Sequence, residues 1–357
     1  MIKKIKRQIS NFYPFIVTNG KKKQINKIWK NTSEEEKEEI IKICKKYNET
    51  DKKIYKDVRY MRYTYGFKYE EYFIYRLKNK TLRKRLTFVS NKDMKGYIAY
   101  LNPAEKKKML RDKYECYLKF KKFYKREMIK IETEEDFKAF STFIKKHKKI
   151  VKKPYNKAFG SGIELIDTGK YKDKKELFKN LLSDGAVVLE ELIIQSKEMK
   201  ALHPSSVNTI RVIPYLKENG EVVIHNPFIK IGQKNSFVDN GGAGGILALI
   251  DEKTGVIKTD AYDENVKCYK VHPDTKVKIK GYQIPKWSEV IELAKELVVL
   301  TPDLKYIGWD MAYTPNGWVV VEGNGATQFI GQQLPDNKGK KKDMEKLICW
   351  GKNRKWV

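Results

Sequence analysis

Residues 306–324, YIGWDMAYTPNGWVVVEGN, carry the pattern of a β-hairpin. The turn sequence TPNG at 314–317 supports this prediction, because proline presets φ at the first central position, asparagine tolerates the second and glycine accepts a left-handed conformation. We expect a three-residue loop, a type I turn followed by a glycine bulge, which places Thr314 opposite Trp318.

Counting outward from this loop assigns the two faces of the hairpin. The predicted pairs are Ala312 with Val320, Asp310 with Glu322, and Gly308 with Asn324. Side chains alternate along a strand, so the opposite face carries an apolar set, namely Ile307, Trp309, Met311, Val319 and Val321. One face therefore belongs to the core, and the other presents two acids and an amide.

The facing acids, Asp310 and Glu322, predict a metal site. Two carboxylates opposite each other in a sheet repel, which lowers stability unless a cation lies between them. Carboxylate and amide oxygens suit Mg²⁺, which commonly takes further ligands from a nucleotide phosphate, so Asn324 would complete the set. Neutralising either acid should then stabilise the metal-free protein. The alternative is a solvated acidic face at a sheet edge.

Composition indicates a folded protein of two or three subdomains, since the chain has 357 residues and a hydrophobic share of 41%. The four cysteines are scattered without CxxC spacing, which favours a reducing cytoplasm over a disulfide or zinc framework. No apolar run approaches the length of a membrane span, and the basic start of the chain is too briefly apolar for a signal peptide.

The formal charge of +30 has two interpretations. Lysine dominates and accompanies abundant Ile, Asn and Tyr, which a biased codon usage would also produce. Alternatively, the charge attracts acidic substrates, an anionic membrane surface or nucleic acid. Nucleic acid is the least favoured of these partners, because the chain contains no recognition motif and its lysines form no single patch.

The first part of the chain reads as helical and the second as mixed. A capping box at Ser33 starts one helix, and further helices are expected at 69–78, 109–124, 134–146, 174–182 and 288–297. Strand-like runs are KKIVKKP, GAVVLEELII, NTIRVIPYL and EVVIHNPFIKIG. The glycine-rich segment 240–245 is the clearest mobile loop.

Lys153 is a candidate phosphate-binding residue. It follows the apolar strand signal Ile150-Val151, and the loop after it carries Gly160 and Gly162. Backbone N–H groups of such a loop can surround phosphate oxygens while a lysine supplies a point charge. Loops with two glycines are common, so an ordinary surface loop is the alternative.

Arg211 and Lys230 are candidate phosphate-neutralising residues. The polar turn Asn219-Gly220 predicts a two-residue hairpin, which places Arg211 opposite Phe228 and diagonal to Lys230. Both cations then project from one face, where they could balance a triphosphate or simply cover the sheet with their stems.

Glu190 and Glu191 end a buried-looking strand. Such a segment suits a hinge whose backbone hydrogen-bonds to the edge of adenine and whose carboxylate accepts hydrogen bonds from ribose hydroxyls. Paired glutamates on an exposed strand edge are the alternative.

In this order, five segments resemble the ATP-grasp superfamily, and specifically the sugar-transfer associated ATP-grasp family. They are IVKKPYNKAFGSGI at 150–163, VVLEELI at 187–193, HPSSVNTIRV at 203–212, VDNGGAGG at 238–245 and GWDMAYTPNGWVVVEGN at 308–324. The resemblance covers roughly residue 80 to the C-terminus. It implies an α+β fold in which two α/β subdomains close on ATP. We expect a helical region at 1–80, then an ATP-grasp domain at 81–357 made of a helical lead-in (81–150), a lid-type subdomain (151–192) and a catalytic subdomain (193–357).

The resemblance also implies roles for single residues. Lys113 and Lys153 would contact nucleotide phosphates, the backbone of Glu190, Glu191 and Leu192 would receive adenine, Asn208, Arg211 and Lys230 would sit by the transferring phosphate, and Asp310, Glu322 and Asn324 would hold Mg²⁺. Relatives are expected to have arginine at position 230, and lysine cannot replace its bidentate recognition.

These observations favour an ATP- and Mg²⁺-dependent ligase that works through an acyl phosphate. The family name suggests a cell-surface glycan precursor, either a small molecule or a lipid-linked anion at the inner membrane surface. A kinase of the same superfamily and a non-catalytic nucleotide or glycan binder are the alternatives. A ligase is preferred over a kinase because neither His203 nor His225 has an obvious carboxylate partner that would make it a general base.

Overall fold

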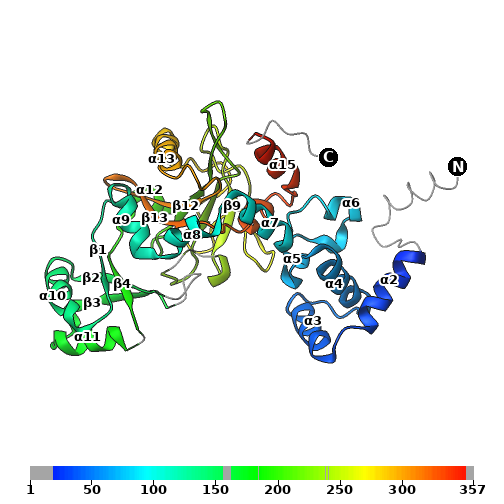
Figure 1. The fold of residues 1–357 in the computed structure, drawn as a ribbon, viewed down its shortest axis with the longest axis horizontal. Helices are drawn as coiled ribbons and strands as arrows, with labels where there is room; N and C mark the ends of the chain where they lie inside the picture. Colours follow the sequence, from blue (N-terminus) through cyan, green and yellow to red (C-terminus); the bar gives the residue numbers. More distant parts are fainter. Residues whose placement is uncertain (1–18, 156–161, 184, 238, 240, 351–357) are drawn as a thin grey trace. The chain divides into compact units, whose positions relative to one another are not determined.

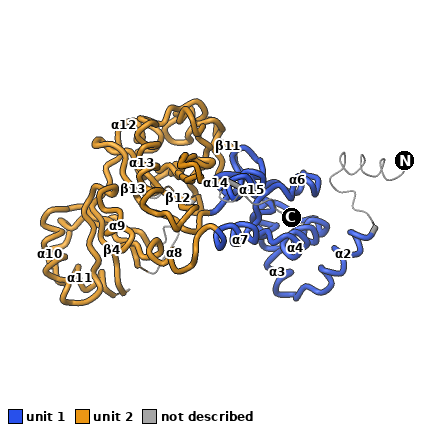
Figure 2. The backbone as a smooth tube through the Cα atoms, turned by 45° about the horizontal axis from the view of Figure 1, so that its top comes forward, with its two compact units in different colours: residues 1–100, 264–267, 328–357 blue, residues 101–263, 268–327 orange. Residues whose placement is uncertain are grey.

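The computed structural model describes residues 19–155, 162–183, 185–237, 239 and 241–350 (Figure 1). The chain forms two compact units, shown in separate colours in Figure 2. Unit 1 holds residues 1–100, 264–267 and 328–357, and unit 2 holds 101–263 and 268–327. Residues 328–357, which the sequence assigned to the catalytic subdomain, thus fall in unit 1. The predicted functional subdomains themselves stay a prediction.

Unit 1 is helical. Its helices are α2 (Asn19–Lys30), α3 (Glu34–Lys46), α4 (Lys52–Tyr65), α5 (Tyr69–Ile74), α6 (Leu82–Arg85), α7 (Asn91–Leu101), α14 (Ile330–Gln333) and α15 (Lys341–Trp350). The predicted cap of α3 is confirmed, because the Ser33 hydroxyl accepts from the Glu36 N–H. The C-terminal segment joins this unit through Gln333, whose side chain exchanges two hydrogen bonds with the backbone of Val89.

Two helix predictions were too long. The helix expected at 69–78 ends at Ile74, because Arg76 adopts a left-handed conformation and a short 3₁₀ helix, η1 (Leu77–Asn79), follows. The helix expected at 109–124 is two helices, α8 (Ala104–Arg111) and α9 (Lys113–Tyr124). Asp112 separates them: its backbone is extended, and its carboxylate caps α9 by accepting from two backbone N–H groups.

Unit 2 contains a four-stranded antiparallel sheet in the order β1-β4-β2-β3. Its strands are β1 (Met128–Ile131), β4 (Val187–Glu191), β2 (Lys149–Pro154) and β3 (Glu164–Asp167). Helices α10 (Phe137–Lys146) and α11 (Lys174–Leu182) pack on it through a buried cluster that includes Phe140, Phe178 and Leu189. The predicted strands KKIVKKP and GAVVLEELII and the helix at 174–182 are confirmed.

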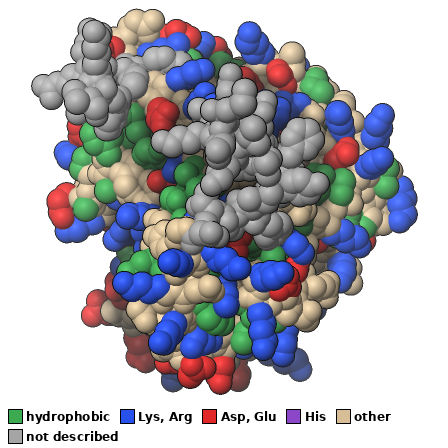
Figure 3. Space-filling view, turned by 90° about the vertical axis from the view of Figure 1, so that its right-hand side faces the viewer, with side chains coloured by type: hydrophobic (Ala, Val, Ile, Leu, Met, Phe, Trp, Pro, Cys, Tyr) green, Lys and Arg blue, Asp and Glu red, His purple; other side chains and the backbone are tan. Residues whose placement is uncertain are grey.

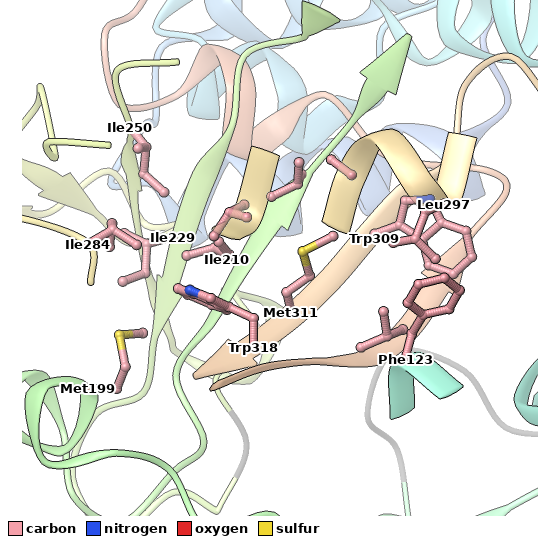
Figure 4. Close-up of a cluster of buried hydrophobic side chains, with 14 of the residues drawn as sticks. Phe123, Met199, Ile210, Ile229, Ile250, Ile284, Leu297, Trp309, Met311 and Trp318 are labelled. Carbon is pink, nitrogen blue, oxygen red and sulfur yellow. The ribbon is translucent and has the colours of Figure 1, made fainter. Parts of the chain in front are cut away.

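A seven-stranded antiparallel sheet forms the rest of unit 2, in the order β11-β10-β9-β8-β5-β12-β13. Its strands are β11 (Cys268–Tyr269), β10 (Ala261–Tyr262), β9 (Ile246–Leu249), β8 (Phe228–Ile231), β5 (Thr209–Val212), β12 (Gly308–Thr314) and β13 (Gly317–Asn324). A small hairpin of β6 (Pro214–Leu216) and β7 (Val222–Ile224) adjoins α13 (Trp287–Val299). Figure 4 shows Trp309, Met311 and Trp318 among the apolar side chains that pack on this sheet.

The decisive hairpin is confirmed, but its loop is shorter than expected. Thr314 pairs with Gly317, so two residues connect the strands, and Ala312 pairs with Val319 instead of Val320. A β-bulge between Asp310 and Met311 then restores the predicted pairing of Asp310 with Glu322 and of Gly308 with Asn324. The core face consequently carries Val320 and Trp318 with Trp309 and Met311, and not the predicted Val319 and Val321.

The second hairpin deviates in the opposite sense. Lys217 N donates to Glu221 O, so three residues form the loop where two were expected. The run 208–215 is also split into β5 and β6. Across this break the pairing of Arg211 with Phe228 is preserved, as predicted.

Candidate active site

Asp310 is the centre of a buried charge cluster on the seven-stranded sheet. It lies on β12, and antiparallel pairing places it beside Arg211 of β5. Arg211 Nε donates to Oδ1 at 2.7 Å and Nη2 to Oδ2 at 2.6 Å, the bidentate geometry that suits a guanidinium and a carboxylate. Lys230 of β8 adds a third hydrogen bond, from Nζ to Oδ2 at 2.9 Å.

The electrostatics follow from this geometry. The Asp310 side chain is 1% exposed. Burial alone would raise its pKa, but the charges and hydrogen bonds of Arg211 and Lys230 hold the pKa of this carboxyl well below its usual range. Burial would lower the pKa of Lys230, and the carboxylates of Asp239 and Asp310 raise it. The three side chains therefore remain charged together.

Glu322 and Asn324 border this cluster on β13. Asn324 Nδ2 lies 3.0 Å from Glu322 Oε1 and 3.4 Å from Asp310 Oδ2, so both predicted acids face one amide group. The Glu322 side chain is 49% exposed, and its Oε1 lies 3.9 Å from Arg211 Nη2. The structure thus brings together the three residues predicted to hold Mg²⁺.

These three residues fit a magnesium ion by their chemistry. All supply oxygen, provided that the Asn324 amide turns its Oδ1 toward the carboxylates, and amide orientation follows the bonding partners present. Asp310 already accepts from two cations, so a metal would share that carboxylate with Arg211 and Lys230. Within the described residues, no three His, Cys, Asp or Glu side chains form a metal cluster on their own. Water and phosphate oxygens would therefore have to complete the coordination.

Lys153 pairs with a buried acid of the four-stranded sheet. Its Nζ lies 2.9 Å from Glu190 Oε1, and the Glu190 side chain is 3% exposed. Arg126 Nη2 approaches the other oxygen of Glu190 at 3.3 Å. Burial would raise the pKa of Glu190, but Arg126 and Lys153 keep it lowered. The Glu190 carboxylate is thus held by two cations, and a contact of this strand with ribose stays a prediction.

Lys113 contacts the end of β2 and is influenced by the charges of Lys153 and Glu322. Its Nζ donates to the carbonyl oxygens of Pro154 and Tyr155 at the end of β2, at 3.1 and 3.2 Å. Burial lowers the pKa of Lys113, Glu322 raises it and Lys153 lowers it, so it senses charges from both sheets. Lys113 is therefore influenced by Glu322 of the carboxylate cluster and by Lys153, the other lysine predicted to bind the nucleotide.

For the other residues predicted to contact the nucleotide, the structure gives positions and few side-chain contacts. Glu191 Oε2 accepts from the Glu127 N–H at 3.0 Å, and Leu192 directly follows the end of β4. Gly162 adopts a left-handed φ of 73°. Gly160 lies outside the described residues, as does Asn240 of the glycine-rich segment. The described part of that segment contains the 3₁₀ helix η4 (Gly241–Ala243).

Asn208 is the predicted catalytic residue that the structure places elsewhere. It is fully buried. Its Nδ2 donates to the carbonyls of Met199 and His203, each at 2.8 Å, and to Gln195 Oε1 at 3.1 Å. Its Oδ1 accepts from the Gly232 N–H at 3.3 Å. Because the amide is used by the protein interior, Asn208 supports the loops around the cluster. Its place beside the transferring phosphate stays a prediction.

The profile of the sugar-transfer associated ATP-grasp family matches residues 92–347. This chain belongs to that family. The match spans most of the chain and includes both sheets of unit 2, so the ATP-grasp fold expected from the sequence is confirmed. No curated protein matched the chain.

Several solved ATP-grasp structures resemble the chain at low identity. The ligase PsnB, solved with a precursor variant, Mg and ADP, is 13% identical, with a TM-score of 0.42 over 70% of this chain and 62% of its own. D-alanyl-alanine synthetase A from Vibrio cholerae is 13% identical, with a TM-score of 0.42 over 69% and 65%. The VanG D-Ala:D-Ser ligase from Enterococcus faecalis is 14% identical, with a TM-score of 0.42 over 69% and 62%. The chain spans less than two thirds of these neighbours.

Asp239 is a further member of the buried charge cluster around Asp310, and it was not among the residues predicted from the sequence. Its Oδ1 lies 3.7 Å from Lys230 Nζ, and its Oδ2 accepts from the backbone and hydroxyl of Thr209 at 2.8 and 2.5 Å. Burial raises the pKa of Asp239, opposed by Lys230 and Thr209. Its position in the VDNGGAGG segment was the available signal, but nothing local indicates which residue its carboxylate meets.

Proposed function

We propose that this protein is an ATP- and Mg²⁺-dependent ligase that activates a carboxylic acid as an acyl phosphate and transfers the acyl group to an amine or hydroxyl. The observation that carries the proposal is the meeting of the Asp310, Glu322 and Asn324 oxygen set with the Arg211 and Lys230 cations. Phosphoryl transfer requires this balance of positive and negative charge around a metal-bound triphosphate.

Each of the predicted site residues would have a distinct role in the reaction. Lys113 and Lys153 would bind the nucleotide phosphates as point charges. Arg211 and Lys230 would stabilise charge that develops on the transferring γ-phosphoryl group, with Arg211 using its planar fork. When bound to Asp310, Glu322 and Asn324, Mg²⁺ neutralises phosphate charge.

The chemical steps need no side-chain nucleophile. A carboxylate oxygen of the substrate attacks the γ-phosphorus, the bond to the β–γ bridging oxygen breaks, and ADP leaves. An amine then attacks the acyl carbon, loses a proton and expels phosphate. The substrate carboxylate is already ionised near neutral pH, so the first step requires no base.

A kinase of the same superfamily is the second candidate, and Asp239 favours it. The sequence-based preference for a ligase relied on the lack of a recognisable general base. Asp239 is a buried carboxylate in the cluster with a raised pKa, and such a group could accept the proton of a hydroxyl nucleophile. The nucleotide-binding half of the site would serve either reaction.

Trapping the intermediate distinguishes these candidates. A ligase given ATP, Mg²⁺, its acid and hydroxylamine yields a hydroxamate together with ADP, because an acyl phosphate is electrophilic at carbon. We expect a hydroxamate from a panel of amino acids and sugar acids, and much less from the Glu322→Gln protein at the same low Mg²⁺ concentration. A stable phosphomonoester without hydroxamate would make the protein a kinase.

The family name and the charge support the substrate class that we propose. Figure 3 shows Lys and Arg side chains spread over the visible face among fewer acidic ones. Within the described residues, no helix is long and apolar enough to cross a membrane. We propose an anionic glycan precursor, soluble or lipid-linked, with the protein binding an anionic membrane surface from the cytoplasm. Binding to phosphatidylglycerol vesicles but not to phosphatidylcholine vesicles, lost at high salt, would support surface attachment.

A further inference from the structure

The β-bulge in β13 determines which face Glu322 occupies. Residues 311–314 pair with 317–320 in one register, and that register, if continued, would pair Asp310 with Val321 and Trp309 with Glu322. Glu322 would then share the buried face of Trp309, because a shift of one residue moves side chains to the opposite face. The extra residue Val321 prevents this and places Glu322 opposite Asp310.

Arg126 holds the two carbonyl groups at this bulge. Its Nη1 donates to Val320 O at 2.6 Å, and its Nη2 donates to Val321 O at 3.3 Å. In a regular strand the carbonyls of successive residues point to opposite edges, so one guanidinium reaches both only where the ladder is disrupted. β13 is the edge strand of its sheet, which leaves these carbonyls accessible to a side chain from outside the ladder.

The same guanidinium reaches the nucleotide side of the site. Arg126 Nη2 lies 3.3 Å from Glu190 Oε2, and Glu190 Oε1 lies 2.9 Å from Lys153 Nζ. The three side chains are only 5%, 3% and 11% exposed, so solvent screens their charges weakly. A continuous chain of hydrogen bonds and ion pairs therefore runs from the bulge of β13 to the phosphate-binding candidate on β2.

We propose that Arg126 is a positioning residue with two separate roles: it supports the nucleotide-binding lysine Lys153 through Glu190, and it holds the metal-binding face of the hairpin through the bulge. One arm keeps Glu322 in register with Asp310, and the other keeps Glu190 ionised beside Lys153. The proposal rests on the proposed function, since it assumes that Lys153 meets a nucleotide and Glu322 a metal. In this proposal Arg126 acts through Glu190 and the bulge, and not by touching the nucleotide or the metal.

Two substitutions separate the arms. Arg126→Lys retains a charge for Glu190, but a lysine cannot span two carbonyls and a carboxylate. We expect it to weaken Mn²⁺ binding to the ADP complex by about tenfold, the effect typical of groups that orient metal ligands, while metal-free ADP binding changes little. Glu190→Gln leaves the contacts of Arg126 to Val320 and Val321, so it should weaken ADP binding and spare Mn²⁺ binding. Both constants can be measured by titration calorimetry.

A second measurement requires no ligand. If Arg126 holds the bulge, backbone amides at 320–324 of the nucleotide-free protein should exchange hydrogen faster in Arg126→Lys than in wild type. Arg83→Met is the matched control, because Arg83 is an exposed arginine of unit 1 and should change neither exchange at 320–324 nor either binding constant. Thermal unfolding of each variant establishes that it is folded before binding is compared.

The outcomes are distinct. Wild-type Mn²⁺ affinity and unchanged exchange at 320–324 in folded Arg126→Lys would overturn the role of Arg126 while leaving the proposed function intact. Weakened Mn²⁺ binding in Glu190→Gln equal to that in Arg126→Lys would show that the arms are not separate and would also overturn it. A wild-type protein that binds neither ADP nor Mn²⁺ would refute the proposed function and both roles of Arg126 toward ligands, and the exchange rates would still report whether Arg126 holds the bulge.

Discussion

Arg211 binds Asp310 through both carboxylate oxygens, at 2.7 and 2.6 Å, although the two residues are 99 positions apart in the chain. With Lys230, this pair neutralises the acid that faces Glu322 across the hairpin. The repulsion expected from two facing acids is therefore already relieved by cations of neighbouring strands. The sequence predicted that neutralising Asp310 would stabilise the metal-free protein, and this arrangement predicts the opposite.

Asp310→Asn should destabilise the protein. Neutralising one of two facing acids would raise stability if they met alone, but this substitution leaves two buried cations without their partner. Removing one member of a buried ion pair typically lowers the free energy of unfolding by about 3–5 kcal/mol. Urea unfolding measures the change. A variant as stable as wild type or more so would show that Arg211 and Lys230 do not depend on Asp310.

Glu322→Gln should change stability by less than about 1 kcal/mol, because the side chain is half exposed and its charged contact is long. Its effect should appear in the metal instead. We expect the Mg²⁺ concentration for half-maximal ADP release to rise about tenfold or more. An unchanged Mg²⁺ requirement would remove Glu322 from the metal site.

Arg211→Lys should lower kcat by about a hundredfold while the dissociation constant of ADP remains near that of wild type, if the guanidinium acts on the transferring phosphoryl group. Lys153→Met should instead weaken ADP binding. Lys149→Met is a suitable control, since Lys149 is an exposed lysine of the same strand β2. Small and equal effects of Arg211→Lys and Lys153→Met on kcat and on the dissociation constant of ADP would show that Arg211 and Lys153 support the fold and do not act on the nucleotide.

Glu71 should make stability depend on pH. This buried acid of α5 accepts from the backbone N–H groups of Lys68 and Asn91, and burial raises its pKa to about 7. Between the unfolded value of about 4.3 and the folded value, the folded state binds more protons, so its stability falls with rising pH by about 1.4 kcal/mol per unit. The stabilising contribution is full below about pH 4.3 and is lost by about pH 7.

Glu71→Gln removes this titration. The free energy of unfolding of wild type relative to the variant should decline from pH 5 to 7 and level off above it, as measured by urea unfolding at each pH. A difference that does not vary with pH would show that Glu71 is ionised in the folded protein throughout this range.

Both hairpins of the site show how far local patterns determine register. The loop before β13 is one residue shorter than its turn sequence suggested, and the loop before β7 is one residue longer. In each case an irregularity nearer the site compensates: a bulge in β13, and an extra residue between β7 and β8, where Asn226 has a φ of 43°. Asp310 with Glu322 and Arg211 with Phe228 therefore pair as predicted. Turn chemistry identifies a hairpin, but packing of the side chains decides its register.

The sequence by itself determined which residue types share a face, since alternation along a strand is local. It also determined the family, through five ordered segments. Tertiary structure alone decided which cations neutralise which acids, because Arg211 and Lys230 reach Asp310, and Lys230 approaches Asp239, from separate strands and loops. The tertiary structure also buries the Asn208 side chain and brings Arg126 to the bulge of β13. A hydrogen bond between residues distant in the chain depends on how the sheets are assembled, and no local pattern encodes that assembly.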